Sequence, residues 1–533
     1  MPYPTSSTSS TERTGHDARR GESQRQRYAS FSRAYHPVSK LTRPAGNSSH
    51  ASAASIHILD DDSILYLFYL YRPAIFDGDD SDDTRPIGGK GWKREQWWYK
   101  LAQVCQRWRM LILGSASYLG LFLVCTNGTP VAEMLVHSPS LPLVIEYYPE
   151  NGDLTAEDEY GIILALEKRD RVCRIRLGTH IPQLQKLIMA IDGEYPVLEY
   201  LIIIPSRLDR SNPRIPSKAL MLPETFQAPH LRHLTLKSCA LPVESRFLTT
   251  AVGLVTLCLI MGHPSAYFQP DTLLQWISFM PQLETLVFRI FTNDDVEKQL
   301  ILHTPIVTRI TLPNLRLLAF TGPSAYLEVV VCQITTPCLQ KLIIHFPIQM
   351  TFSVPHLLQF MESTNNLRFN NAEFMFSQGE VCLEVYPPED AEMYALSMHV
   401  HCLPLELQAY FMAQIFNLPT SQIFSTVQHL TLKYKIHGSF EEHNEVVCSK
   451  WDNLLRLFSN VKTLHVNDVL GRESSRILQL DDGVRPLELL SELQELTYSG
   501  SADTGGASSS FPRFVIPLSR GSMPGLSIFD LLT

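Results

Sequence analysis

The sequence predicts an α/β fold in which a short helical domain precedes a long, irregular array of strand–helix units. Two observations support this prediction. An apolar-x-x-Leu-x-apolar pattern recurs from residue 172 to residue 498. Within residues 61–113, apolar residues fall at spacings of three and four, the periodicity of amphipathic helices. The predicted segments are a disordered basic tail (1–54), a helical domain (55–115), a repeat array (116–498) and a partly disordered tail or cap (499–533).

Composition and charge narrow the classes of function. Hydrophobic residues make up 45% of the 533 residues, enough to bury a large core. No apolar run approaches the roughly 18–20 residues of a membrane-spanning helix, so we expect no membrane contact. The net charge of −9 disfavours nucleic-acid binding, because phosphate contacts need clustered Lys and Arg. The ten cysteines form no C-x-x-C pair and no apolar leader is visible. These features predict a cytoplasmic or nuclear protein.

The predicted helical domain contains two helices joined by an acidic loop. Aspartates 60–62 offer N-caps for a first helix, whose apolar face includes Ile64 and Phe68. Residues 73–91 are rich in Asp and Gly and predict a solvated loop. A second helix is predicted from about residue 93 to residue 113. The Ser-, Thr- and Arg-rich residues 1–54 resemble a transit peptide in composition, but acidic residues interrupt them.

The recurring pattern predicts leucine-rich repeats. Its copies advance by about 29 residues on average, the upper end of that repeat's period. Its last two apolar positions would point inward from a short strand, and stacked units would share a core. About 10–12 units are predicted, with weaker copies at Leu367 and Leu396. The clear copies begin at Val172, Leu198, Leu231, Leu254, Leu283, Leu315, Leu339, Val427, Val461 and Leu493.

Two features predict that the array is irregular. The usual repeat has Asn or Cys three residues after its last Leu, and only the copy ending at Cys239 has it. Around Gln378 and Gly379, apolar residues alternate with polar ones, which predicts an inserted β-hairpin.

The helical domain resembles an F-box. Residues 104–109 read Val-Cys-Gln-Arg-Trp-Arg and Leu111 follows, similar to the C-terminal half of that motif. The upstream residues from Ile58 to Phe68 resemble its first helix. The wider sequence of residues 97–139 is similar to F-box-like proteins of mushroom-forming fungi. The resemblance covers roughly residues 56–498, and an F-box followed by leucine-rich repeats is the arrangement of F-box/LRR proteins.

This resemblance implies a substrate-receptor subunit of a Skp–cullin–F-box E3 ubiquitin ligase. The F-box would dock a Skp-type adaptor and through it a cullin, while the repeats would hold an unknown protein substrate. Other subunits would transfer ubiquitin, so no catalytic residue, cofactor or metal is expected in this chain. The predicted adaptor-docking face comprises Leu59, Ile64, Leu67, Phe68, Leu101, Val104 and Trp108.

An alternative is a ligase-independent repeat scaffold, in which the helices serve only as an N-terminal cap. The long acidic loop favours it, as does Leu59-Asp60 where an F-box usually has Leu-Pro. An enzyme is not favoured, because no phosphate-binding loop, metalloprotease motif or nucleophile elbow occurs. His399, His401 and Cys402 contain metal-ligand side chains, but a surface strand edge is the preferred interpretation.

Overall fold

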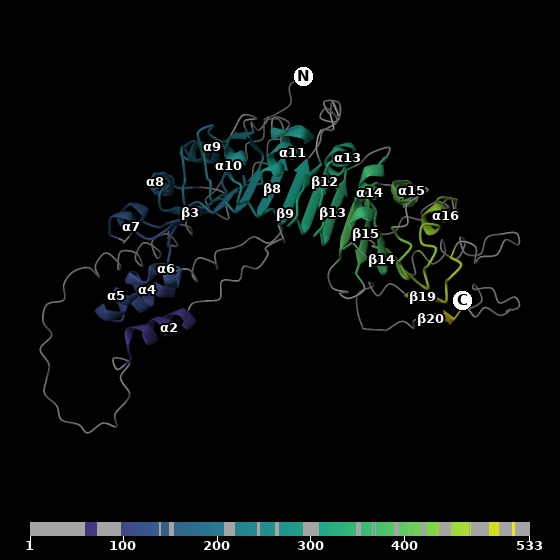
Figure 1. The fold of residues 1–533 in the computed structure, drawn as a ribbon, viewed down its shortest axis with the longest axis horizontal. Coiled ribbons are helices and arrows are strands. Elements are labelled where there is room, and N and C mark those ends of the chain that lie inside the picture. Colours follow the sequence, from purple (N-terminus) through teal and green to yellow (C-terminus); the bar gives the residue numbers. More distant parts are fainter. Residues whose placement is uncertain are drawn as a thin grey trace, which may run out of the picture. The chain divides into compact units, whose positions relative to one another are not determined.

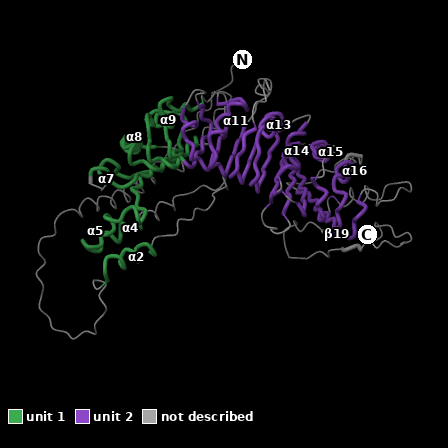
Figure 2. Tube along the Cα trace, in the orientation of Figure 1, with its two compact units in different colours: residues 1–231 green, residues 232–533 purple. Residues whose placement is uncertain are grey.

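The structure is a computed structural model. The chain divides into two compact units, residues 1–231 and 232–533, which are described separately (Figure 2). The expected basic tail (1–54) and acidic loop (73–91) lie outside the described residues. The described residues are 59–71, 97–137, 140–148, 154–206, 219–241, 246–261, 266–290, 309–347, 353–364, 366–367, 369–387, 394–402, 405–416, 423–435, 449–467, 470, 490–499 and 514–517.

The first unit begins with a helical block, formed by α2 (Asp61–Tyr71), α4 (Trp97–Ala102), α5 (Gln106–Gly114) and α6 (Ala116–Leu119). Asp60 caps α2, since its Oδ1 accepts the Ser63 N–H at 2.6 Å. The prediction of one continuous second helix is wrong, because the helix is interrupted between α4 and α5. Cys105 is extended there and acts as N-cap of α5, accepting the Trp108 N–H at 3.5 Å through Sγ.

The block leads into four parallel strands. In order they are β1 (Leu123–Thr126), β2 (Leu143–Tyr147), β3 (Val172–Leu177) and β4 (Tyr200–Ile203). The intervening helices are α7 (Val131–His137), α8 (Ala156–Leu166) and α9 (Ile181–Met189), and a short β5 (Leu220–Met221) follows. Strands β1 and β2 precede the first repeat copy predicted from the sequence. They were missed because they are short apolar runs without the Leu-x-x-Leu-x-Leu spacing.

The second unit continues the alternation of strand and helix. In the sheet its strands follow the order β6-β8-β9-β11-β13-β16-β15-β14-β17-β18-β19-β20. Helices α11 (Pro270–Ser278), α13 (Ser324–Val331) and α14 (Pro355–Ser363) lie along one side of these strands (Figure 1). The strands of this sheet are β6 (His233–Lys237), β8 (Thr256–Met261), β9 (Thr285–Ile290), β11 (Leu317–Thr321), β13 (Lys341–Phe346), β14 (Asn371–Phe376), β15 (Glu380–Tyr386), β16 (Leu396–His401), β17 (His429–Tyr434), β18 (Thr463–Asn467), β19 (Glu495–Ser499) and β20 (Phe514–Pro517).

Helices connect many of the successive strands of this unit along the chain. Helix α11 follows β8 along the chain, and helix α14 follows β13. Three short strands stand outside the long sheet: β7 (Cys239–Ala240), β10 (Ile310–Thr311) and β12 (Ile334–Thr335). The helices are α10 (Phe247–Thr250), α11 (Pro270–Ser278), α13 (Ser324–Val331), α14 (Pro355–Ser363), α15 (Leu405–Phe416) and α16 (Ser449–Leu455).

The repeating apolar residues form the core, as the sequence pattern predicts. In β9, for example, Leu286 and Phe288 are buried, and so is Leu283 at the start of that copy. Parallel pairing keeps the copies in register, because Leu286 lies opposite Leu257 on β8 and Leu318 on β11. Each unit therefore shares its inner face with its neighbours, which no single unit could bury alone.

A proline-containing turn introduces many of the strands. In residues 312–315, the Leu315 N–H donates to the Leu312 carbonyl, and Pro313 occupies the second position of the turn. Proline suits that position because its ring fixes φ near −65°. Asn314 in the same turn donates through Nδ2 to the Pro281 carbonyl of the preceding turn at 3.0 Å. Asn366 makes the equivalent bond to the Pro337 carbonyl at 3.1 Å. These asparagines lie in the turns that enter the strands, whereas the Asn or Cys of the usual repeat follows the last Leu of the strand.

The hairpin predicted around residues 378–379 is confirmed. Strands β14 and β15 pair antiparallel on either side of that turn. Strand β15 is also antiparallel to β16, which in turn pairs parallel with β13. The weak copy proposed at Leu367 forms the turn before β14, whose inward residues are Ala372, Phe374 and Phe376. Placing His399 on a sheet edge was wrong, since β16 lies between β13 and β15.

Two further findings concern the described residues only. None of their helices has both the length and the apolar character required to cross a bilayer. Their nine cysteines are all free, and Cys338 is exposed rather than buried.

Candidate functional site

The helical block has a small aromatic core. The Phe68 ring of α2 meets the Trp108 ring of α5 edge-on, with 4.9 Å between centroids. Ile64, one turn before Phe68, is 1% exposed, and Phe68 itself is 3% exposed. Both residues belong to the predicted docking face, but they are buried inside the block. Their position in the structure is that of core residues holding α2 against α5.

An arginine fixes the start of α2 against α5. Arg107 donates from Nε and Nη2 to Oδ1 of Asp61, at 2.9 and 2.7 Å. The same Nη2 lies 2.7 Å from the Leu59 carbonyl oxygen. Nearby, Arg109 donates from Nε to the Ala102 carbonyl at 3.0 Å. This carbonyl at the C-terminal end of α4 thereby gains a hydrogen-bond donor. These bonds orient α2, α4 and α5 relative to one another within the block.

The block exposes many large apolar side chains. Of the other predicted docking residues, Leu59, Leu67 and Val104 are exposed, while Leu101 and Trp108 are half-buried. The sequence analysis missed further exposed apolar side chains on the same block. A signal was present, since an unbroken apolar run from Ile64 to Tyr71 is too long for one buried helical face. The missed residues are Tyr66, Tyr69, Leu70, Tyr71, Met110 and Tyr118.

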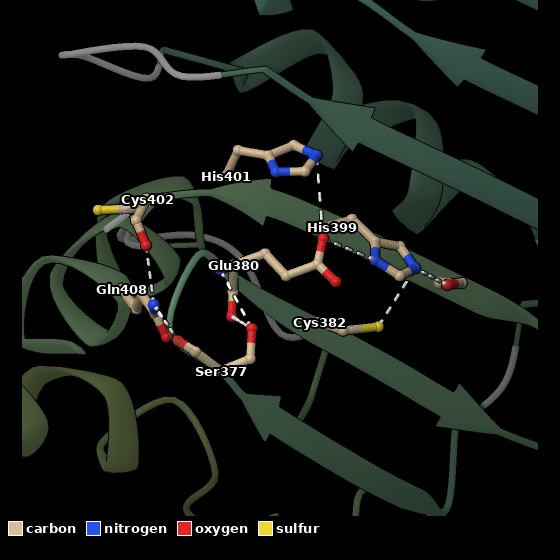
Figure 3. Close-up of polar contacts among 8 residues, drawn as sticks. Ser377, Glu380, Cys382, His399, His401, Cys402 and Gln408 are labelled. Atoms are coloured by element: carbon tan, nitrogen blue, oxygen red, sulfur yellow. Dashed lines mark hydrogen bonds and ion pairs between the residues drawn. The ribbon is translucent and has the colours of Figure 1, made fainter. Parts of the chain in front are cut away.

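A second cluster, polar in character, lies on the outward face of β15 and β16. Figure 3 shows the Glu380 carboxylate between two imidazoles. Its Oε2 lies 3.8 Å from His399 Nδ1 and 3.8 Å from His401 Nε2. The other ring nitrogen of His399 lies 3.3 Å from Cys382 Sγ and 3.2 Å from Ser397 Oγ. Cross-strand pairing explains this arrangement, because Glu380 lies opposite His401 and Cys382 lies opposite His399.

Burial favours the uncharged forms of His345, His399 and Cys382. The ring of His345 on β13 stacks on that of His399 at a centroid distance of 4.0 Å. Burial lowers the pKa of His345 to about 3 and also lowers the pKa of His399. Burial, followed by the nearby Glu384 carboxylate, raises the pKa of the Cys382 thiol to about 12. The thiol is therefore protonated at neutral pH, which does not suit a nucleophile.

A buried glutamine joins the hairpin to the end of β16. Gln408 of α15 donates from Nε2 to the Ser377 carbonyl at 2.7 Å and to the Cys402 carbonyl at 2.8 Å (Figure 3). This fixes the hairpin turn beside the cluster.

Within the described part of the chain, no group of three His, Cys, Asp or Glu side chains is arranged to hold a metal ion. What the cluster offers is a carboxylate-bearing surface.

Comparison with known proteins returned few matches. No protein-family model and no curated protein matches this chain. Among solved structures, it is similar to the crystal structure of the leucine-rich repeat-containing protein LegL7 from Legionella pneumophila. The TM-score is 0.24 and the identity is 11%, over 71% of this chain and 91% of that chain. The described strands form a long, mostly parallel sheet with helices between them along the chain, an arrangement consistent with leucine-rich repeats.

Proposed function

We propose that the chain is a non-catalytic substrate-receptor subunit of a Skp–cullin–F-box ubiquitin ligase. The helical block docks a Skp-type adaptor, and through it a cullin, in the cytoplasm or nucleus. The repeats hold a protein substrate. The observation that carries this proposal is the apolar exposure of α2, an 11-residue helix with five exposed large apolar side chains: Tyr66, Leu67, Tyr69, Leu70 and Tyr71.

Such a helix face favours a protein partner. Contiguous apolar surface that stays in water is characteristic of interaction sites. An amphipathic helix face gains most of its affinity when it packs into a complementary groove. Leu67 and Val104, both in the F-box-like sequence, are exposed, while Phe68 and Trp108 hold the helices in position. The docking face proposed here therefore consists of Leu59, Leu67, Leu70 and Val104.

Capture of the full chain by a purified Skp-type adaptor tests the proposal. The double variant Leu67→Asp/Leu70→Asp puts charge on the docking face without touching the buried core. Since central apolar contacts dominate protein interfaces, we expect its affinity for the adaptor to fall by about 30-fold or more. Val136→Asp is the matched control, because Val136 is an exposed aliphatic residue on α7. Equal capture of all three proteins would contradict the proposal.

A second function, a repeat scaffold capped by the helical block, has one observation in its favour. Ile112, Leu119 and Leu121 are buried where the block leads into β1. Apolar residues at this junction would also suit a cap over the first repeat. A well-folded wild-type chain that does not bind the adaptor would favour this alternative.

A further inference from the structure

One row of side chains crosses the outward face of the sheet in the second unit. On β9 the core-facing residues Leu286 and Phe288 are buried, while Val287 between them faces outward and is half-buried. Strand pairing continues this row from Val287 through the neighbouring strands, one residue on each. On β8, β9, β11 and β13 the row is apolar. We call these residues the apolar stripe: Cys258, Val287, Ala319 and Ile343.

The same row is polar on both sides of the apolar stripe. Thr235 of β6 precedes it and Ser397 of β16 follows it. Polar or charged residues then continue the row through the hairpin and the parallel strands after it. They are Glu384, Glu373, Thr431, His465 and Thr497. Folding of this sheet therefore does not require an apolar residue at these outward positions, and the apolar stripe needs another explanation.

Further apolar side chains widen the apolar stripe. Ile260 and Leu317 occupy outward positions on β8 and β11, the same strands as two members of the stripe. Leu317, Val287 and Ile343 are half-buried, so part of each side chain meets solvent. Adjoining apolar side chains on an outward face are characteristic of protein interaction sites.

The charges around the apolar stripe are mostly positive. The outward positions of β6, β8, β9, β11 and β13 include three cations and no carboxylate, the cations being Lys237, Arg289 and Lys341. The residues immediately before β6, β9 and β11 are Arg232, Glu284 and Arg316. The Lys341 ammonium lies 4.1 Å from the centre of the Tyr394 ring, a contact that leaves its charge in place. These strands therefore favour a partner that carries carboxylates.

We propose that the apolar stripe binds an extended segment of a partner protein that has apolar residues at every second position and acidic residues between them. Neighbouring strands lie about 4.8 Å apart, so four strands make the stripe about 14 Å long. Side chains on one face of an extended segment recur about every 7 Å, so three of them match this length. The inference rests on the proposed role of the repeats in holding a protein substrate, but not on adaptor docking.

Two cations stand on opposite sides of the apolar stripe. Arg289 follows Val287 by two residues on β9, whereas Lys341 precedes Ile343 by two residues on β13. Because β9, β11 and β13 are parallel, these offsets place the two cations on opposite sides of the row. Carboxylates between the apolar residues of the segment can then pair with either cation. A nucleic acid is disfavoured, since the stripe contains no aromatic ring on which a base could stack.

The first test measures binding of a fluorescent 12-residue peptide to the full chain. The peptide has three leucines at every second position, with aspartates and serines elsewhere. We expect Val287→Asp, which puts a carboxylate into the apolar stripe, to weaken binding about ten-fold or more. His465→Asp is the matched control, because it makes the same residue in the polar part of the same row. It should leave the affinity within about two-fold.

A second pair of variants tests the charges without altering the apolar stripe. We expect Arg289→Gln/Lys341→Gln to weaken binding of the peptide about five-fold. Arg246→Gln/Lys435→Gln is the control, since it removes one exposed arginine and one exposed lysine elsewhere in the same unit. Circular dichroism and thermal unfolding establish which variants are folded. If Val287→Asp does not fold, the two double variants decide the question.

The possible outcomes separate this inference from its alternatives. Equal weakening by each variant and its control would show attraction by overall charge alone and would overturn the inference. Tighter binding of single-stranded oligothymidylate than of the peptide would overturn it in favour of a nucleic acid. Peptide binding that appears only after residues 73–91 are removed would identify the chain's own acidic loop as the occupant, which would also overturn it.

Adaptor capture on the same proteins keeps this inference distinct from the proposed function. The variants of the apolar stripe and of its flanking cations should all capture the adaptor as the wild type does. Absence of adaptor capture by the wild type would contradict the proposed function but not peptide binding by the stripe. Adaptor capture without any peptide binding would overturn the inference and leave the docking proposal in place.

Discussion

The Phe68 ring of α2 packs edge-on against the Trp108 ring of α5, at a centroid distance of 4.9 Å and an interplanar angle of 70°. Successive side chains on a helix point about 100° apart. Turning Phe68 inward therefore directs Leu67 away from the same contact. One aromatic pair thus gives the helical block its core and determines which apolar residues of α2 remain exposed.

Replacing Trp108 tests the structural half of this relationship. Because Trp108 is half-buried, we expect Trp108→Ala to destabilise the block by about 2 kcal/mol, less than a fully buried tryptophan would cost. Amide hydrogens of α2 should then exchange up to about 30-fold faster, while those of β9 and β11 keep their rates. Trp108→Phe, which retains a ring, is the control. Unchanged exchange in α2 would show that the pair does not hold the block together.

A buried carboxylate caps a helix in the repeat array. Glu328 of α13 accepts the N–H groups of His356 and Leu357 at the start of α14, at 2.9 and 2.8 Å. Glu328→Ala would leave both donors without this acceptor, and we expect a loss of about 2 kcal/mol. Glu328→Gln keeps an acceptor oxygen and should lose less. Urea unfolding followed by circular dichroism compares the two, and an equal loss would contradict the capping role.

Glu328 also predicts how the stability of the protein depends on pH. Burial raises the pKa of Glu328 above 4.5, although the His356 and Leu357 N–H bonds act in the opposite direction. An acid with a raised folded-state pKa loses stabilising effect as pH rises through that pKa. Wild type should therefore lose stability relative to Glu328→Gln between pH 4 and pH 7. Unfolding midpoints of both proteins across this range provide the measurement, and the opposite trend would refute the prediction.

The buried His345 predicts that stability depends on pH with the opposite sign. Burial first, then His399, Arg289 and His401, lowers its pKa from 6.5 to about 3. Its contribution to stability is present above about pH 6.5 and is lost as pH falls towards 3. Going from pH 7.5 to pH 5, wild type should lose up to about 2 kcal/mol more than His345→Phe, which keeps the stack but cannot titrate. Equal losses in the two proteins would contradict this.

The parts of the fold that depend on local chemistry could be predicted from the sequence. Pro313 followed two residues later by Leu315 predicts a turn entering a strand, because both signals lie within four residues. The alternation around Gly379 predicts the β14–β15 hairpin for the same reason. Inward positions such as Leu286 follow from the two-residue period of a strand.

The parts that depend on distant contacts could not be predicted. The order β13-β16-β15-β14 depends on which strands meet across the sheet, so nothing near His399 indicated a central strand. The break between α4 and α5 depends on a cap by Cys105, a residue that rarely has this role. For the helical block, the periodicity marked Phe68 as apolar, but whether it faces Trp108 or a partner depends on how α2 packs.

The most direct test of the proposed docking is hydrogen–deuterium exchange of the full chain with and without a purified Skp-type adaptor. Docking by the helical block predicts slower exchange in the amides of α2 and α5 when the adaptor is added, and no change in β9, β11 and β13. Leu67→Asp/Leu70→Asp should remove the protection. Adaptor binding that protects only the repeat strands, or that leaves α2 unchanged, would contradict the proposal.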